Sequence, residues 1–214
     1  MAGVEVDHLV VAARNLDEGT DYVFETLGVR PEGGGVHGMM GTHNRLVRLG
    51  VSCYLEVIAI DPDAPEPSRP RWFELDTESM WQRLRKKPRL ITWALRTDKM
   101  ADLYRRNNHV LGRMEPMSRG NLHWELTLTE DGHLPGGGVI PFLIDWKQST
   151  HPATAMADSG CSLAGLRGFH PRPETILPIL ESLGAAPLIE LKISESGPCL
   201  AAFIETPCGL RELR

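Results

Sequence analysis

The chain has 214 residues, of which 42% are hydrophobic and 24% are charged, so it can bury a core and is not of the disordered class. Its formal net charge of −5, without a long run of basic residues, excludes a general nucleic-acid-binding surface. No stretch approaches the roughly 20 apolar residues that span a bilayer, and residues 1–5 lack the features of a signal peptide. We therefore expect a cytoplasmic protein that binds neither nucleic acid nor membrane.

The first 60 residues predict a βαβββ unit. Residues 7–13 and 54–60 are apolar runs typical of strands. Between them, Asn15 stands as an N-cap with Glu18 three residues later, and the helix that they predict ends at Leu27-Gly28. Further strands are expected at 36–40 and 44–49.

The segment 61–70 contains four prolines and ends this unit, because proline continues neither a helix nor a strand ladder. The apolar spacing over 72–84 predicts connecting helices whose tryptophans pack in the core. The first order of elements then returns. A strand at 90–95 precedes a helix that ends at Leu111-Gly112, and strands follow at 122–129 and 139–146.

A small-residue linker at 153–160 leads to a third unit. A strand at 162–166 is followed by a helix that Pro173 opens and Leu183-Gly184 closes. Short strands are expected at 188–193, 200–204 and 209–213. Because Leu-Gly ends all three predicted helices, we interpret the chain as a degenerate threefold repeat.

His8 and Glu56 each interrupt an apolar strand. Side chains alternate along a strand, so His8 shares one face with Val10 and Ala12, while Glu56 shares its face with Tyr54 and Ile58. If the two strands belong to one curved sheet, the imidazole and the carboxylate can meet on its concave face, where the four apolar neighbours would line a pocket for a small organic ligand. Such a pair is the beginning of a metal site.

Several segments together resemble a known family: Asp7 to Ala12, Leu27-Gly28, Met40 to Asn44, Tyr54 to Ile58, and Ile140 to Trp146. They are similar to the vicinal-oxygen-chelate superfamily, also called glyoxalase/bleomycin-resistance, and within it to the glyoxalase-like domain branch. The resemblance implies an α+β fold of repeated βαβββ modules, with an open, U-shaped mixed sheet and helices on the outside. It also implies a divalent metal such as Zn, Ni, Mn or Fe, with ligands at the positions of His8 and Glu56.

These boundaries give a domain organisation. Residues 1–152 form a glyoxalase-like domain of two modules, 4–60 and 89–147, joined by a helical linker at 61–88. Residues 153–214 form a third, βαβββ-like module packed on the same sheet system.

The second half of the metal site departs from the family pattern. Leu90 and Ala164 occupy the positions that correspond to His8, so neither repeat supplies a second ligand there. Replacement residues are His123, Glu125, Asp145 and Glu212, the last of which lies in a segment that resembles the family's ligand-bearing final strand. Each of these could equally be an ordinary surface residue.

Residues around the expected pocket suggest further roles. His43 could act as an acid or base together with Glu56, and Asn44 could bind a substrate carbonyl, although both could simply belong to a turn. Tyr54, His123 and Asp145 are further substrate-binding residues, whereas His8, Glu56 and Glu212 form the expected metal set.

Three functions remain open on the sequence. The first is a metal-dependent lyase, isomerase or dioxygenase that acts on a small oxygen-chelating substrate. The second is a metal-free protein that binds or sequesters a small molecule, as bleomycin-resistance proteins do. The third is a structural remnant in which His8 and Glu56 only pair with each other. The expected partners are a small molecule and, in a homodimer, a second copy of the chain.

Overall fold

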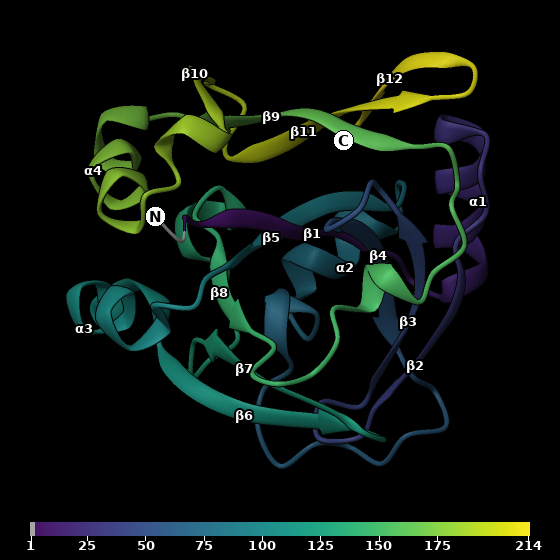
Figure 1. Cartoon of the computed structure of the whole chain (residues 1–214), viewed down its shortest axis with the longest axis horizontal. Coiled ribbons are helices and arrows are strands. Elements are labelled where there is room, and N and C mark those ends of the chain that lie inside the picture. The colour runs from purple at the N-terminus through teal and green to yellow at the C-terminus, as the bar shows by residue number, and fades with distance from the viewer. Residues whose placement is uncertain (1–2) are drawn as a thin grey trace.

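The computed structural model describes residues 3–214, which form an α+β fold with two sheets. The larger sheet has eight strands in the order β2-β3-β4-β1-β5-β8-β7-β6. Its strands are β1 (Glu5–Ala12), β2 (Glu32–His37), β3 (Thr42–Arg48), β4 (Tyr54–Ile60), β5 (Arg89–Arg96), β6 (Arg113–Arg119), β7 (Leu122–Leu128) and β8 (Phe142–Asp145). The sheet curls around the short helix α2 (Glu78–Leu84), as Figure 1 shows.

Two βαβββ modules build this sheet in the same way, as the sequence predicted. In each module the last strand is the parallel neighbour of the first, β4 beside β1 and β8 beside β5. Antiparallel pairing of β1 with β5 joins the modules at the centre of the sheet. The open, U-shaped mixed sheet is therefore confirmed.

A smaller sheet of four strands contains the C-terminal residues, in the order β10-β9-β11-β12. Its elements are β9 (Ser162–His170), α4 (Pro173–Leu183), β10 (Glu190–Ile193), β11 (Cys199–Thr206) and β12 (Gly209–Leu213). The element order is again βαβββ, but here β9 has β10 as its parallel neighbour and β11 on its other side. The third unit thus repeats the element order of the first two with a different strand order.

The sequence signals for the helix ends act as expected. Asn15 Oδ1 accepts a hydrogen bond from the Glu18 amide, and Glu18 Oε1 accepts one from Asn15 Nδ2, each at 2.9 Å. Glycine occupies the C-terminal cap of α1 (Leu16–Leu27), of α3 (Met100–Leu111) and of α4. No helix of residues 3–214 is long and apolar enough to cross a membrane.

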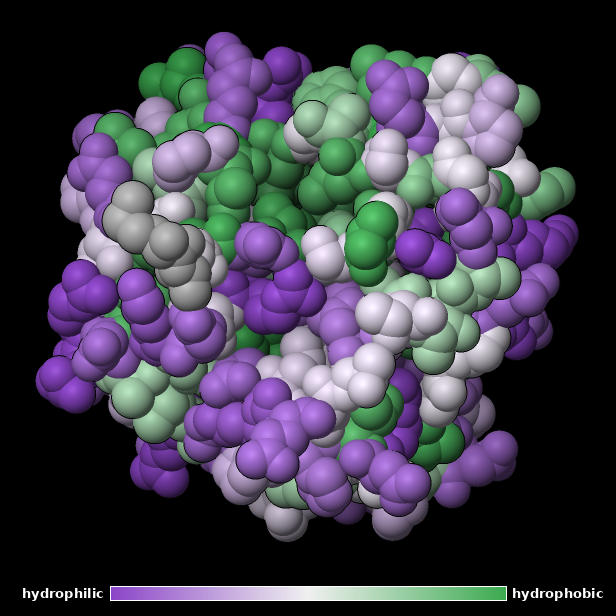
Figure 2. Space-filling view, viewed as in Figure 1, coloured by the Kyte–Doolittle hydropathy of each residue, from purple (hydrophilic) through white to green (hydrophobic). Residues whose placement is uncertain are grey.

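The alternation of side chains along the strands divides the core into two clusters. Leu9 and Val11 of β1 belong to a cluster on the convex face, which also contains residues of α1, α3 and the smaller sheet. Val10 and Ala12 point the other way, into a cluster with Met80 of α2 on the concave face. Figure 2 shows apolar side chains gathered in the hollow between the smaller sheet and the start of β1.

Gly19 lets α1 lie directly against the sheet. A Cβ atom at this position would come within 2.3 Å of Val57 Cγ1 and 2.9 Å of Ala13 Cβ. Alanine normally stabilises a helix interior relative to glycine by about 0.5–1 kcal/mol, but here the added methyl must push the helix away from β4. We expect Gly19→Ala to destabilise the protein by about 1–3 kcal/mol.

Urea denaturation of Gly19→Ala measures this effect, with Glu25→Ala on the exposed face of α1 as the control that should change stability little. A Gly19→Ala protein as stable as the parent would show that α1 does not pack at this distance.

Candidate functional site

The concave face of the larger sheet contains a cavity of about 40 Å³. Polar side chains from five strands line one part of it: His8, His37, Asn44, Glu56 and Arg119. Aromatic side chains form much of the remainder: Tyr54, Trp72, Phe73, Trp124, Phe142 and Trp146. A cavity of this size admits a few waters or the polar end of a ligand, but not a whole organic substrate.

His8 and Glu56 meet in this cavity, as their alternation predicted. His8 pairs with Tyr54 across the β1/β4 ladder, and Glu56 lies one step further along the same face. His8 Nε2 is 3.7 Å from Glu56 Oε2, and both side chains are nearly buried. The His8 ring is stacked on Tyr54, with the ring centroids 4.5 Å apart.

A β-bulge in β1 brings Asp7 to His8. Val6 pairs with Leu95 and His8 with the next residue of β5, Ala94, so Asp7 is an extra residue in the ladder. Bulges re-aim side chains, and here Asp7 Oδ1 lies 2.7 Å from His8 Nδ1. Because an ionised carboxylate only accepts hydrogen bonds, this contact places a proton on Nδ1, and Nε2 is the ring nitrogen that faces Glu56.

Asp7 is fully buried and receives further hydrogen bonds at its second oxygen. Trp146 Nε1 donates to Oδ2 at 2.9 Å, and His151 Nε2 lies 3.0 Å from the same atom. Burial alone would raise the pKa of Asp7, but the hydrogen bonds to His151 and His8 lower it well below its ordinary value. Asp7 is thus an anion that fixes the ring orientation of His8.

Side chains from β3 and β2 contact the carboxylate of Glu56. Asn44 Nδ2 donates to Glu56 Oε1 at 2.6 Å, and His37 Nε2 is 3.9 Å from the same oxygen. His37 Nδ1 lies 3.1 Å from Thr42 Oγ1. Burial lowers the pKa of His37 to about 4, so its imidazole is neutral near pH 7.

The curl of the sheet brings its two edge strands to the same cavity. Arg119, the last residue of β6, donates from Nη1 to Asn44 Oδ1 at 3.3 Å. Its stem lies on β2, because a Cβ added to Gly35 would be 3.0 Å from Arg119 Cδ. Asn44 therefore links the guanidinium of Arg119 to the carboxylate of Glu56.

The aromatic side of the cavity includes a strained turn. Phe73 and Glu74 both have a backbone φ of 60°, which residues other than glycine rarely adopt. The turn is held by Glu74, whose amide donates to the Gly132 carbonyl at 2.8 Å and whose Oε1 accepts from the Leu134 amide at 3.1 Å. This conformation presents Phe73 to Phe142, at 5.4 Å between ring centroids, and strain of this kind is found mainly where a site requires it.

Residues 6–184 match the family described as "Glyoxalase-like domain", a range that covers both modules and continues through β9 and α4. The chain belongs to the glyoxalase-like domain family. The resemblance to the glyoxalase-like domain branch that was drawn from the sequence is therefore confirmed. No curated protein matches this glyoxalase-like chain.

Several solved structures resemble the chain at low sequence identity. A hypothetical protein from Staphylococcus aureus is 14% identical with a TM-score of 0.62, over 92% of this chain and 88% of its own. A methylmalonyl-CoA epimerase in complex with methylmalonyl-CoA is 18% identical with a TM-score of 0.46, over 71% of this chain and 100% of its own. The methylmalonyl-CoA epimerase from Mycobacterium tuberculosis is 17% identical with a TM-score of 0.40, over 65% and 86%.

Of the other site residues predicted from the sequence, the structure brings Asn44 and Tyr54 to His8 and Glu56. His43 does not line this cavity, and its Nδ1 lies 3.9 Å from Asp61. His123 is exposed on β7.

The two remaining acidic residues lie outside the cavity as well. Asp145 and Glu125 both form ion pairs with Lys147, at 2.9 Å and 2.7 Å. Glu212 is on β12 of the smaller sheet, where it pairs with Arg214.

The expected apolar pocket wall is only partly correct. Tyr54 lines the cavity, but Val10, Ala12 and Ile58 are fully buried in the cluster that also contains Met80 of α2. The expectation was wrong for these three residues because the linker helix fills the concave face beside them. The open part of the face lies instead near His8, between β1, β3 and β8.

His37 and Arg119 are members of the cavity that the sequence did not indicate. His37 follows a glycine-rich bend that sets no clear alternation, and Arg119 precedes a glycine in what reads as an exposed turn. A polar residue at a strand end next to glycine was the available signal, but it is shared by many surface hairpins.

The donor geometry fits two ligands of one divalent ion. Metal–ligand distances of about 2.0–2.2 Å for histidine and carboxylate allow two ligand atoms to be up to about 4.3 Å apart, and His8 Nε2 and Glu56 Oε2 are 3.7 Å apart. Over residues 3–214, no group of three His, Cys, Asp or Glu side chains is arranged to hold a metal ion.

Proposed function

We propose that this protein is a divalent-metal-dependent enzyme that acts on a small organic substrate through two neighbouring oxygen atoms. The observation that carries the proposal is the approach of two atoms that can bind a metal ion, His8 Nε2 and Glu56 Oε2, which are 3.7 Å apart on the wall of the small cavity. Two lone pairs directed at each other are unfavourable unless a cation or a proton lies between them. His8 and Glu56 would hold the ion, and it would polarise the substrate oxygens as a Lewis acid.

The residues around this pair support such a role. Asp7 fixes the His8 ring, and Asn44 fixes the Glu56 carboxylate through hydrogen bonds of 2.7 Å and 2.6 Å. Residues that orient metal ligands in this way usually raise their basicity and affinity. His37 Nε2 lies 3.9 Å from Glu56 Oε1, and because burial lowers the pKa of His37 to about 4, the neutral ring adds no positive charge beside the proposed ligands.

A second function, binding of a small molecule without metal, is favoured by the opposite wall. At β8 and the residue that follows it, the cavity is lined by Phe142, Ile144 and Trp146, none of which can bind a metal ion. An aromatic wall facing a few polar groups is typical of sites that bind organic ligands.

Metal titration separates the two functions. Protein purified without chelators should bind one Zn²⁺, Ni²⁺, Mn²⁺ or Fe²⁺ per chain at neutral pH, measured by elemental analysis and calorimetry. We expect His8→Ala and Glu56→Gln each to lower the affinity for the ion by more than about 10-fold. A loss of that size is usual even when only a residue that orients a ligand is replaced.

His123→Ala and Glu212→Gln are matched controls, because both side chains lie outside the cavity. They should bind the ion as the parent does, and circular dichroism checks the fold of each variant. A folded parent protein that takes up none of these ions would refute the metal-dependent function. Binding of a small molecule without metal would then be the remaining proposal.

A further inference from the structure

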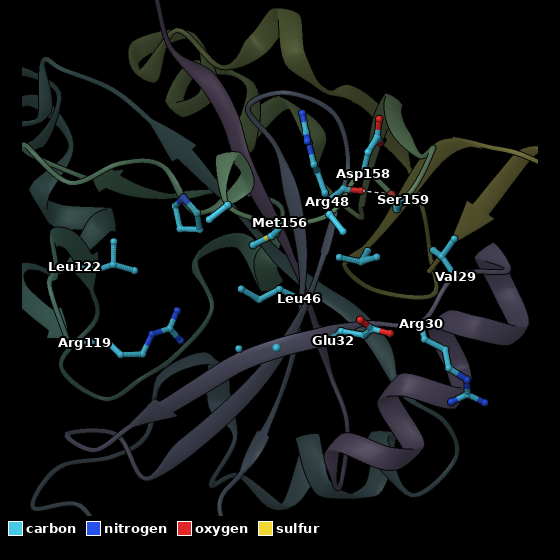
Figure 3. A pocket seen from close by; sticks show the side chains of 16 residues that line it. Val29, Arg30, Glu32, Leu46, Arg48, Arg119, Leu122, Met156, Asp158 and Ser159 are labelled. Atoms are coloured by element: carbon cyan, nitrogen blue, oxygen red, sulfur yellow. Dashed lines mark hydrogen bonds between the residues drawn. The ribbon is translucent and has the colours of Figure 1, made fainter.

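A much larger pocket lies next to the small cavity. This outer pocket has a volume of about 560 Å³, and it shares Leu46 and Arg119 with the small cavity. Figure 3 shows Arg119 and Leu122 at one end, Glu32 and Arg30 at the other, and Leu46 and Met156 between them. A volume of this size suits the body of an organic ligand, and Leu46 and Arg119 separate it from the small cavity and line both spaces.

Most of the outer pocket is apolar. Its lining includes Val29, Leu46, Val47, Leu122, Ala155 and Met156. Such side chains favour a hydrocarbon body over a polar one, since burial is worth about 0.8 kcal/mol per CH₂ group. The far end contains the carboxylates of Glu32 and Asp158, which disfavour a second negative charge there.

The cations of the lining differ in their partners. Arg30 forms an ion pair with Asp21 at 3.0 Å, and Arg48 Nε donates to the Gly50 carbonyl at 2.8 Å. Within residues 3–214, neither Arg48 nor Arg119 forms an ion pair with a carboxylate. Arg119 differs from Arg48 in lining both the outer pocket and the small cavity, and its Nη1 donates to Asn44 Oδ1 at 3.3 Å. Arg119 lies where the apolar pocket meets the polar cavity. Figure 3 shows its side chain next to Leu122.

We infer that this site takes an organic monocarboxylate with an apolar chain, whose carboxylate is bound by Arg119 and whose chain lies in the outer pocket over Leu46 and Met156. A guanidinium matches a carboxylate with two parallel hydrogen bonds. Through Asn44, the bound carboxylate would lie beside Glu56, so the acid end of the ligand faces the inner cavity. The inference rests on the proposed function for the location of the reacting end, because it names the substrate class of the same site.

Binding of octanoate and of octanamide, which differ in charge but hardly in shape, tests this inference by calorimetry on the full chain without added metal. Octanoate should bind about 10–100-fold more tightly than octanamide, the usual effect of a charged hydrogen-bonded pair. Arg119→Gln should remove this preference. Arg30→Gln, whose charge is paired with Asp21 on the outer rim, is the matched control and should retain it.

Gly35→Ala provides a second variant that leaves the guanidinium in the chain. The new methyl would lie 3.0 Å from Arg119 Cδ and 3.2 Å from its Nη1, so the guanidinium must shift by a few tenths of an ångström. Octanoate should therefore bind more weakly while octanamide binding changes little. Equal affinity for the two probes in the parent, or octanoate affinity unchanged by Arg119→Gln, would overturn the inference, as would no octanoate binding at all.

The metal titration keeps this inference distinct from the proposed function. Arg119→Gln should take up the ion with the parent's affinity, because Arg119 contacts neither proposed ligand directly. Loss of the octanoate preference with intact metal uptake would support the inference. A parent that prefers octanoate but binds no metal would retain the inference while refuting the metal-dependent function.

Discussion

Asp7→Asn should lower the free energy of unfolding by about 3–5 kcal/mol, the usual effect of removing one member of a buried charged network. Asp7 is fully buried and is contacted by His8, His151 and Trp146 at distances of 2.7–3.0 Å. Asparagine keeps the shape of aspartate, but it removes the negative charge and turns one acceptor into a donor, which then faces a donor. Urea denaturation at pH 7 measures the change, and Asp131→Asn, in an exposed pair with His133, should change stability by less than about 1 kcal/mol.

The same substitution has a defined dependence on pH. The pKa of Asp7 is lower in the folded protein than its ordinary value of 3.8. Its stabilising effect is therefore complete above about pH 4 and is lost as the pH falls below that value, because the unfolded chain then binds the proton more tightly. The stability difference between the parent and Asp7→Asn should shrink below pH 4. A difference that is constant from pH 7 to pH 3 would show that the charge of Asp7 does not contribute.

Trp93→Ala should destabilise the protein by about 3–5 kcal/mol, the usual cost of truncating a buried tryptophan. The side chain is fully buried on the convex face of β5, in the cluster that also contains Leu200 and Ile204 of the smaller sheet. Its Nε1 donates to the Val139 carbonyl at 3.0 Å. The substitution leaves a cavity between the two sheets and a buried carbonyl without its donor.

Trp93→Phe is the informative comparison, since it keeps most of the packing and removes the hydrogen bond. It should destabilise by about 1–3 kcal/mol, the range for leaving a buried polar group unsatisfied. Chemical denaturation of both variants tests the order. If Trp93→Ala were no less stable than Trp93→Phe, the smaller sheet would not depend on this contact.

Local sequence determined the elements and the facing of their side chains. Alternation along residues 7–13 and 54–60 was enough to place His8 with Val10 and Ala12, and Glu56 with Tyr54 and Ile58, because side chains along a strand have a two-residue period. The pairing of β1 with β4 then puts both sets on one face of the sheet. The Asn15 and Glu18 cap and the glycine after each helix were equally local, since their hydrogen bonds close within a few residues. The βαβββ order followed from these signals, while the family was indicated by the resemblance of whole segments, such as Asp7 to Ala12 and Tyr54 to Ile58, to a known family.

Tertiary structure decided which residues complete the site. The β-bulge that turns Asp7 toward His8 depends on the pairing of β1 with β5. These strands are about 90 residues apart in the sequence, and no local pattern encodes their pairing. His37 and Arg119 lie on opposite edge strands, and only the curl of the whole sheet brings them to one cavity. The linker helix α2 closed the face beside Val10 and Ala12 for the same reason. Spacing in the sequence fixes the direction of a side chain within its own strand, whereas its neighbours across the sheet depend on register and curvature, which are properties of the packed whole.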